Sequence, residues 1–584
     1  MRKIVPIMLL LSLNSSLSSA KSTSDKSTLF LVGGGLKSCS SMSLKHCSQN
    51  AFADKQQLEN AKKHALYSIN LNSIKLLNNA WPETYSLTSK QNIIKVLTSI
   101  QKAESANLIS PTQLKALFKE YDNRRVIKKL NDAEYYLMLD LLEQPVMAKG
   151  TDVRLKEQVD LGNSTHLFST EIYRSFVNLA KDVSNANKPK ILVITASARD
   201  PFEAVDFYQQ AFSQAGSDAS WLPLDATLNA LIQQPGNRKE VCQQLAAKRL
   251  EVQGSMNREW VYPDLIQKQL EACLSPQKML DDIASADGIF INGGDQSLTL
   301  GAFINIDGSD SQALELIKQK LIDGKLVIGG TSAGTAVMSG GTFNQSPVVM
   351  ITNGQSNTAL VRGAKKDVLP IEGCQKSARC AQNLLNDDLT YRSKGGLGLF
   401  HWGILDTHFS ERGRQGRLAK LTLDTDARFA FGVDEATALV VEQINNEQIA
   451  LKVVGQSGVF IVDNSLNSKD KTSVMTHYIT RDDKLSLSSE GLNFSFSQWK
   501  TSPMEKAELP LTVADIFTDN RYQQTAELLC RTDNSQVAAS STWNKQSNTI
   551  SIEKPVDAIS RFGVMTWKNT SRSYCSYQNY ILSF

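Results

Sequence analysis

The chain has 584 residues, of which 41% are hydrophobic, 7% aromatic and 21% charged. This balance is typical of a globular protein and excludes disordered, collagen-like and coiled-coil chains. The 63 basic and 59 acidic residues leave a formal net charge of +4, too close to neutrality to indicate a nucleic-acid-binding protein. No stretch reaches the ~18 apolar residues of a membrane helix. At ~100–200 residues per domain, the length predicts about two to four domains.

Residues 1–20 have the pattern of a secretory signal peptide. Arg2 and Lys3 form a basic start, the apolar run 4–13 follows, and the small residues 18–20 offer a cleavage site. The apolar run is too short to span a bilayer, so a buried helix is the alternative. No cysteine follows the cleavage site directly, which gives no indication of a lipid anchor. We therefore expect export to the periplasm or the medium.

All eight cysteines follow this segment. An even number of cysteines in an exported protein predicts disulfides, although about a hundred pairings are conceivable. Pairing between sequence neighbours is the simplest hypothesis, since each bridge then closes a local loop. No CxxC motif occurs and only His46 lies beside a cysteine, so we predict no metal site. The hypothetical bridges are Cys39–Cys47, Cys242–Cys273, Cys374–Cys380 and Cys530–Cys575.

The first strand is predicted over 28–32, within a segment 21–50 that we assign to the catalytic domain. It runs into Gly33-Gly34-Gly35, but position 38 is serine, so the dinucleotide-binding pattern GxGxxG is not present. We interpret the glycines as a turn where backbone segments pass closely. Residues 51–186 have a helical period without a group of polar motif residues, which predicts an inserted helical layer or lid.

Strands and helices alternate over 187–464, the predicted catalytic domain. Continuously apolar strands between helices predict an α/β fold with a mostly parallel sheet that is covered on both faces. Active sites of such sheets lie at the carboxyl ends of the strands. A polar linker then precedes 474–584, predicted to be a small β-rich accessory domain closed by a disulfide. The clearest apolar strands are 191–195, 288–292, 326–329 and 403–406.

The sequence GTSAG, centred on Ser332, is a GxSxG motif between an apolar strand and a helix-forming run. This motif places a serine on a strained strand-to-helix turn, and the start of the helix offers amides to an oxyanion. Without partners, a glycine-rich turn is an equally good interpretation. A nucleophilic serine also needs a base and a carboxylate that orients the base. These partners decide whether Ser332 is a candidate nucleophile.

Candidate partners of Ser332 follow two later strands. His408 directly follows an apolar strand, whereas His401 precedes the same strand and falls at its other end. Asp434 and Glu435 follow the next apolar strand, and either could orient the histidine; a strand-end turn is the alternative. The order serine, histidine, acid differs from that of α/β-hydrolases. We expect the three side chains to meet at one rim of a single sheet.

Three arginines, Arg412, Arg414 and Arg417, lie beside the candidate base His408. They indicate a pocket that binds carboxylates, and a solvated basic helix face is the alternative. The sequence GGDQ, which ends at Gln296, follows another apolar strand. Its glycine amides could complete an oxyanion site, with the glutamine in contact with the substrate.

Four sequence blocks together resemble the cyanophycinases, in a serine peptidase family that also contains aspartyl dipeptidases. The blocks are IFINGGDQ, GGTSAGTAVMSGG, GLGLFHWGILDTHFSERGRQGRL and FGVDEATALVV. The resemblance covers 29–35 and 190–463, about half the chain. It implies a three-layer α/β sandwich that resembles class I glutamine amidotransferases, with serine in place of the elbow cysteine. The helical insertion and the tail are additions to this pattern.

The resemblance also assigns roles to residues. It implies a triad of Ser332, His408 and Glu435, and an oxyanion hole from the amides of Gly294 and Ala333. Thr407 stands where the family has glutamine. The implied substrate-binding residues are Gln296, Asp406, Thr407, Arg412, Arg414 and Arg417.

The function that the resemblance implies is hydrolysis of cyanophycin, a poly-aspartate whose β-carboxyls carry arginine through isopeptide bonds. Family members release β-Asp-Arg dipeptides as exopeptidases. The reaction passes through an acyl-enzyme and needs no cofactor. Arginines would bind the α-carboxylate, while acids such as Asp406 would hold a cationic or amino end. The resemblance further implies a homodimer. Two alternatives stay open: an aspartyl or isoaspartyl dipeptidase that acts on short peptides, and a non-catalytic polymer-binding protein.

Overall fold

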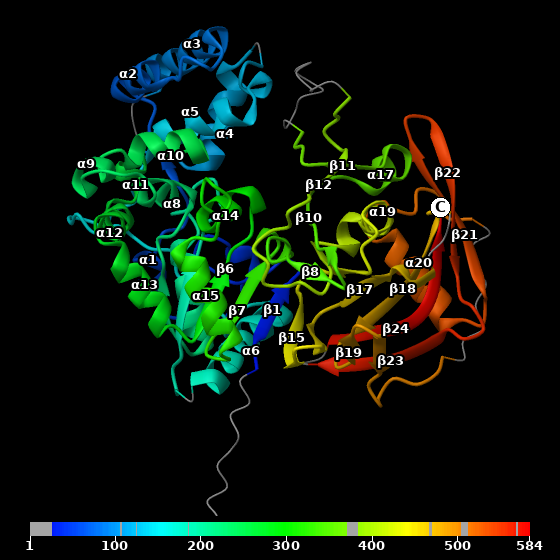
Figure 1. Cartoon of the computed structure of the whole chain (residues 1–584). Helices are drawn as coiled ribbons and strands as arrows, with labels where there is room; N and C mark the ends of the chain where they lie inside the picture. The colour runs from blue at the N-terminus through cyan, green and yellow to red at the C-terminus, as the bar shows by residue number, and fades with distance from the viewer. Residues whose placement is uncertain are drawn as a thin grey trace, which may run out of the picture.

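Figure 1 shows the computed structural model of the chain. The structure describes residues 26–104, 108–123, 125–184, 186–370, 383–466, 470–503, 512–567 and 570–584. The predicted signal peptide and the predicted bridge Cys374–Cys380 lie outside these residues. None of the helices in the described ranges is long and apolar enough to cross a membrane.

The larger sheet has nine strands in the order β20-β19-β16-β15-β1-β7-β6-β4-β5. The five strands from β1 to β5 in this order are parallel to one another, and the remaining pairings are antiparallel. The predicted α/β class is therefore confirmed, with the parallel strands forming one half of the sheet. The strands are β1 (Thr28–Val32), β4 (Lys190–Ile194), β5 (Asp218–Trp221), β6 (Gly288–Ile291), β7 (Val327–Thr331), β15 (Thr437–Asn445), β16 (Gln448–Gly455), β19 (Lys484–Ser488) and β20 (Gly491–Ser495).

Alternate side chains of the parallel strands enter two separate cores. Leu31 and Ile289 lie in a core with α13 (Pro276–Ser285) and α15 (Gln312–Ile322). Phe30 and Phe290 point to the other face, into a core with α6 (Leu167–Ser184) and α7 (Val205–Ala215). Each such fully buried side chain stabilises the fold by ~1.5–3 kcal/mol. This two-sided burial explains why the strands are continuously apolar.

The smaller sheet has eight strands, in the order β13-β14-β17-β18-β24-β22-β21 with β23 paired to β24. The tail strands β18 and β21–β24 continue this sheet, while β19 and β20 continue the larger one. The polar stretch 464–473 therefore does not separate two sheets. The strands are β13 (Ile404–Thr407), β14 (Phe429–Val433), β17 (Gly458–Asp463), β18 (Ser473–Thr480), β21 (Gln536–Trp543), β22 (Gln546–Glu553), β23 (Ile559–Trp567) and β24 (Thr570–Ser583).

Four helices of the inserted region form a lobe with its own core, at the top left of Figure 1. Capping boxes at Asn70, Ser110 and Asn131 begin three of them, because each side chain accepts a hydrogen bond from the first-turn backbone. The later helix α6 instead packs on the large sheet. The lobe helices are α2 (Leu71–Ala80), α3 (Leu87–Ala103), α4 (Pro111–Tyr121) and α5 (Asp132–Leu142).

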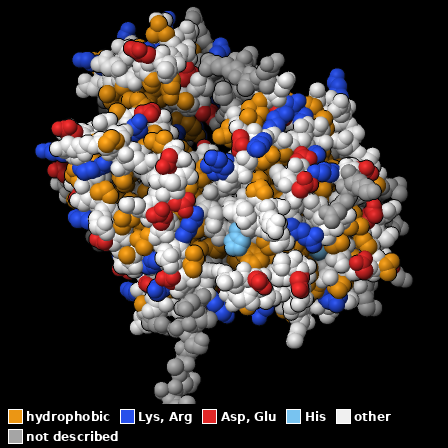
Figure 2. All heavy atoms as spheres, in the orientation of Figure 1, with side chains coloured by type: hydrophobic (Ala, Val, Ile, Leu, Met, Phe, Trp, Pro, Cys, Tyr) orange, Lys and Arg blue, Asp and Glu red, His pale blue; other side chains and the backbone are white. Residues whose placement is uncertain are grey.

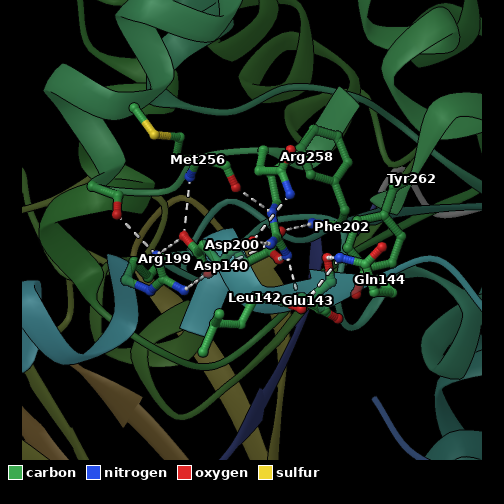
Figure 3. A network of polar contacts seen from close by, with 12 residues as sticks. Asp140, Leu142, Glu143, Gln144, Arg199, Asp200, Phe202, Met256, Arg258 and Tyr262 are labelled. Carbon is green, nitrogen blue, oxygen red and sulfur yellow. Dashed lines mark hydrogen bonds and ion pairs between the residues drawn. The ribbon is translucent and has the colours of Figure 1, made fainter. Parts of the chain in front are cut away.

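A buried ion-pair network joins this lobe to the parallel sheet (Figure 3). Arg258 donates to Glu143 at 2.8 Å and to Asp200 at 2.7 Å. Arg199 donates to both oxygens of Asp140, each at 2.8 Å. Removing one partner of such a buried pair strands the other charge, so the network fixes the lobe against the loop that follows β4.

Three disulfides close loops as predicted: Cys39–Cys47, Cys242–Cys273 and Cys530–Cys575. The last joins α20 (Arg521–Arg531) to β24. The other short helices are α1 (Lys55–Glu59), α8 (Ala226–Ile232), α9 (Arg238–Cys242), α10 (Leu245–Gln253), α11 (Arg258–Val261), α12 (Pro263–Leu274), α14 (Gln296–Phe303), α16 (Ala333–Ala336), α17 (Ser356–Arg362) and α19 (Gln415–Asp424). The short strands are β2 (Leu66–Tyr67), β3 (Glu143–Gln144), β8 (Thr342–Phe343), β9 (Ser346–Pro347), β10 (Met350–Asn353), β11 (Ala364–Lys366) and β12 (Leu389–Arg392).

Basic and acidic side chains are interspersed on the face of the molecule shown in Figure 2. Hydrophobic side chains appear there in small groups between polar ones. This face therefore presents no extended field of one sign.

Candidate active site

Ser332 lies on the turn between β7 and α16, with φ 54° and ψ −116°. Side chains other than glycine rarely adopt such a positive φ, so the backbone at this serine is strained. The flanking glycines leave room for the turn. A Cβ on Gly330 would overlap the carbonyl oxygen of Gly334, and a Cβ on Gly334 would lie 2.5 Å from the carbonyl oxygen of Ile291. The predicted strand-to-helix turn is confirmed.

The side chains of Ser332, His408 and Glu435 form one hydrogen-bonded chain. Nε2 of His408 lies 2.8 Å from Oγ of Ser332, and its Nδ1 lies 2.7 Å from Oε1 of Glu435. With a proton on Nδ1, the ring donates to the carboxylate and accepts from the serine. The hydrogen bond and charge of His408, with Lys37 and Arg412, lower the pKa of Glu435. The orienting group is therefore an ionised carboxylate at neutral pH.

The neighbouring Asp434 does not contact the histidine. Its carboxylate accepts from the hydroxyl of Tyr478 at 2.5 Å and from the amide of Ser410 at 2.9 Å. Glu411 lies behind the triad and accepts from the amide of Glu435 at 3.1 Å. Burial raises the pKa of both Asp434 and Glu411. The strand pattern left the two acids open and the family resemblance implied Glu435, which is the acid in contact with His408.

The end of β1 binds the backbone of all three segments that carry these side chains. Three successive carbonyl groups of β1 and its glycine turn each accept one hydrogen bond, so the three segments share a single support. The bonds run from Ser332 N to Val32 O (3.0 Å), from His408 N to Gly33 O (2.7 Å) and from Ala436 N to Gly34 O (2.8 Å).

The glycine turn after β1 also makes room for the triad side chains. A Cβ on Gly34, whose φ is 107°, would overlap the imidazole ring of His408. A Cβ on Gly35 would lie 2.5 Å from Oε2 of Glu435. The predicted close backbone passage is confirmed. The sequence did not indicate that a histidine and a glutamate are what pass there.

The three side chains come from two sheets, so the expectation of one rim of a single sheet is wrong. Ser332 follows β7 of the larger sheet, whereas His408 and Glu435 follow β13 and β14 of the smaller one. The chain crosses between the sheets at 434–436, because β14 and β15 belong to different sheets. Strand patterns do not specify which sheet a strand joins, so this crossing could not be predicted locally.

Gly294 and Ala333, whose amides are the predicted oxyanion donors, border the same pocket as Ser332. Ser197 supports the first of them: it accepts from the amide of Asp295 at 2.7 Å, and a Cβ on Gly294 would overlap its carbonyl oxygen. This serine was missed by the sequence analysis because it carries no motif. Two residues after Ser197, Arg199 donates to Asp140 of the helical lobe in the ion-pair network of Figure 3.

A pocket of about 150 Å³ opens beside Ser332. Every predicted site residue except Glu435, which lies behind the histidine, borders this pocket. The predicted residues that it brings together are Gly294, Gln296, Ser332, Ala333, Asp406, Thr407, His408, Arg412, Arg414 and Arg417. The bordering residues that the sequence did not indicate are Ala336, Ile351, Thr352 and Asn353.

Asp406 anchors two of the pocket arginines. Its side chain is 1% exposed; Arg417 donates to it at 2.8 and 2.5 Å and Arg414 at 3.2 Å. Burial alone would raise the pKa of Asp406, but the two guanidinium charges hold this pKa below its usual value. Burial also lowers the pKa of Arg414 to about 9, which leaves it protonated at pH 7. The expectation that Asp406 holds a cationic substrate group is corrected, because both its oxygens are occupied.

Arg412 is the pocket arginine that stays available to a ligand. Its guanidinium is exposed and makes no ion pair or hydrogen bond within the described ranges. Together with Arg414 and Arg417 it sets three guanidinium groups against the single carboxylate of Asp406, a net charge of +2 on the pocket wall. A ligand with a carboxylate matches this excess.

Gln296 and Thr407, which were expected to contact the substrate, also make hydrogen bonds within the protein. Nε2 of Gln296 donates to the carbonyl oxygens of Ile351 and Thr352, both at 3.1 Å, so only its carbonyl group is left for a ligand. The backbone oxygen of Thr407 accepts from Arg414 at 2.5 Å. In the described part of the chain, no group of three or more histidine, cysteine or acidic side chains could hold a metal ion.

Comparison with curated proteins finds cyanophycinases. The chain is 27% identical over 286 residues to those of Trichormus variabilis and Nostoc sp., a match that covers 48% of this chain and 74% of each relative. About half of the chain is related to cyanophycinases. The cyanophycinase of Geminocystis herdmanii is 30% identical over 186 residues, 31% of this chain and 51% of that protein. No protein-family model matches the chain. These matches thus cover about half of the chain or less.

Proposed function

We propose that the protein is an exported serine exopeptidase that hydrolyses cyanophycin to β-Asp-Arg dipeptides. The observation that carries this proposal is the hydrogen-bonded chain of Ser332, His408 and Glu435 at the edge of an arginine-rich pocket. The related proteins are named cyanophycinases, which supports the substrate class.

In the proposed reaction, Oγ of Ser332 attacks the scissile carbonyl while Nε2 of His408 takes the hydroxyl proton. The carboxylate of Glu435 stabilises the imidazolium that forms. The amides of Gly294 and Ala333 donate to the oxyanion of the tetrahedral intermediate. The imidazolium then gives its proton to the leaving amine, and water hydrolyses the acyl-enzyme by the same steps in reverse order.

The pocket wall supports recognition of a carboxylate next to the scissile bond. Arg412 offers a guanidinium that makes no ion pair with any described residue, and the two arginines held by Asp406 add positive charge behind it. Paired N–H groups of a guanidinium suit a carboxylate better than a single ammonium does. Cleavage at a chain end is proposed from the resemblance of the sequence blocks to cyanophycinases, which act as exopeptidases.

Export is proposed from the basic and apolar start of the sequence together with the disulfides. Three bridges join six cysteines, and such bridges persist in oxidising compartments. The substrate would then be polymer from outside the cell. Activity in the medium and the periplasm, compared with that in the cytoplasm, tests this part of the proposal.

The decisive experiment is product analysis after incubation of the purified mature protein with insoluble cyanophycin. We expect β-Asp-Arg dipeptides from the wild type and a loss of about three orders of magnitude or more in rate for Ser332→Ala. Ser213→Ala, at an exposed serine on α7, is the matched control and should be fully active. Cleavage of short aspartyl peptides alone would indicate a dipeptidase, and polymer binding without turnover would indicate a binding protein.

A further inference from the structure

A second cavity, of about 420 Å³, continues from the active-site pocket. The two share Arg412, Arg414 and Arg417, so the arginine wall borders both. The second cavity is also bordered by two aspartates, Asp387 and Asp519. It therefore combines a wall of excess positive charge with carboxylates.

The two aspartates are the acids of this region that stay available to a cation. Asp387 accepts a hydrogen bond from Gln355 at 3.1 Å, and neither it nor Asp519 makes an ion pair in the part of the chain that the structure describes. By contrast, Asp406 is occupied by arginines. Glu411 accepts from the backbone, and burial favours its neutral form by raising its pKa.

The tail of the chain brings Asp519 to the segment 412–417, which carries the three arginines and is called the arginine loop. Phe517, two residues before it, is 6% exposed and packs against two glycines of that loop. A Cβ on Gly413 would overlap the carbonyl oxygen of Phe517, and a Cβ on Gly416 would lie 3.0 Å from its ring. The ring of Phe517 also stacks on Tyr522 of α20, with centroids 6.0 Å apart. This packing holds the tail segment, and with it Asp519, beside the arginine wall.

We propose that Asp387 and Asp519 form a subsite for the guanidinium of an arginine arm of the substrate, while Arg412 binds the carboxylate of the same arm. The inference rests on the proposed function and names the part of the substrate that this site recognises, an arginine linked to the β-carboxyl of one aspartate. An arginine joined through its α-amino group keeps a free carboxylate and a cationic end, which the two walls of the cavity complement. Charge-assisted hydrogen bonds from the guanidinium to two carboxylates supply the attraction.

The test compares a synthetic β-Asp-Arg oligopeptide with its citrulline analogue, which has the same shape but no cationic end. We expect the wild type to prefer the arginine peptide. In the double variant Asp387→Asn/Asp519→Asn, kcat/KM on the arginine peptide should fall ~10–100-fold, while kcat/KM on the citrulline peptide stays within about twofold. Asp533→Asn, at an exposed aspartate of the same tail, is the matched control and should keep the wild-type preference.

An unchanged arginine preference in the double variant would overturn the subsite while leaving the peptidase proposal intact. If the wild type cleaves neither peptide, the peptidase proposal fails and binding decides the subsite. Calorimetry then compares Ser332→Ala with the triple variant Ser332→Ala/Asp387→Asn/Asp519→Asn on both peptides. Tighter binding of the arginine peptide only where both aspartates are present supports the subsite, and equal binding by the two proteins overturns it.

Discussion

The triad and the arginine pocket lie side by side but are held in place by different interactions. Backbone hydrogen bonds to the end of β1 and the space left by Gly34 and Gly35 position the triad. Side-chain ion pairs to one buried carboxylate, Asp406, position two of the pocket arginines, Arg414 and Arg417. The tail then packs against the arginine loop through Phe517.

This difference matches what each part has to do. Proton transfer between a serine and a histidine requires the two side chains to keep hydrogen-bond distance. Backbone hydrogen bonds to β1 leave the segments that carry these side chains little freedom to move apart. Carboxylate binding depends on guanidinium groups that outnumber the nearby acid and are held in place, and Asp406 holds two of the three. We therefore expect backbone changes near the triad to act on kcat and charge changes in the pocket to act on KM.

The largest effect is expected from Gly34→Ala. Its new Cβ would overlap the imidazole of His408, so the ring must leave the line between Ser332 and Glu435. We expect kcat on cyanophycin to fall by about three orders of magnitude with KM little changed. Gly150→Ala is the matched control, because Gly150 also has a positive φ but open space around it. Retention of more than about a tenth of kcat by Gly34→Ala would contradict the backbone support.

The next effect is expected from Asp406→Asn, which leaves two guanidinium groups without their carboxylate. We expect kcat/KM to fall ~100-fold, mainly through KM, and the free energy of unfolding to fall by about 3–5 kcal/mol. Steady-state kinetics and urea unfolding measure both. Asp206→Asn breaks a similarly buried pair with Arg154 outside the pocket. It should lower stability without raising KM, and a similar rise in KM for this control would argue against a specific role of the arginine positions that Asp406 fixes.

A smaller effect is expected from Arg412→Gln, which removes the guanidinium that has no partner in the described part of the chain. KM should rise ~10-fold while kcat stays within a few-fold, since the group binds a carboxylate without touching the reacting atoms. The free energy of unfolding should change by less than about 0.5 kcal/mol because the side chain is exposed. Arg174→Gln, at an exposed arginine of α6, controls for general charge. An unchanged KM in Arg412→Gln would remove the carboxylate-binding role.

The smallest effect on activity is expected from Glu411→Gln. Glu411 lies between the triad and the arginines, because it accepts from the amide of Glu435 and borders the second cavity. Burial and the charge of Asp434 raise the pKa of Glu411 to about 8. Between the unfolded carboxylate pKa of ~4.3 and this value, the native state holds a proton that the unfolded state has lost. Stability therefore falls as pH rises through this window, by at most about 1.4 kcal/mol per pH unit from this group. Glutamine removes the titration and keeps an acceptor for the amide of Glu435.

Urea unfolding at pH 5 and pH 7.5 measures this linkage. The Glu411→Gln variant should gain stability relative to the wild type as pH rises between these values. Parallel pH dependences of the two proteins would show that Glu411 is ionised in the native state, against the effect of its burial.

The sequence by itself determined the chemical parts of the candidate site. Local patterns predicted the GxSxG turn, the histidine at a strand end, the arginines and three disulfide pairings. A strained turn, an apolar strand and a short loop each require particular residue types at consecutive positions, so they can be recognised in a short stretch of sequence. The family resemblance assigned roles to ten of the residues that now border one pocket.

Only the tertiary structure decided how these parts meet. It placed Ser332 on one sheet and His408 on another, occupied Asp406 with arginines and brought Phe517 from the tail to the arginine loop. Each of these depends on which distant strands pair and on which side chain fills the space beside a glycine. The free energies of such long-range packing are sums over the whole fold, and no short stretch of sequence records them.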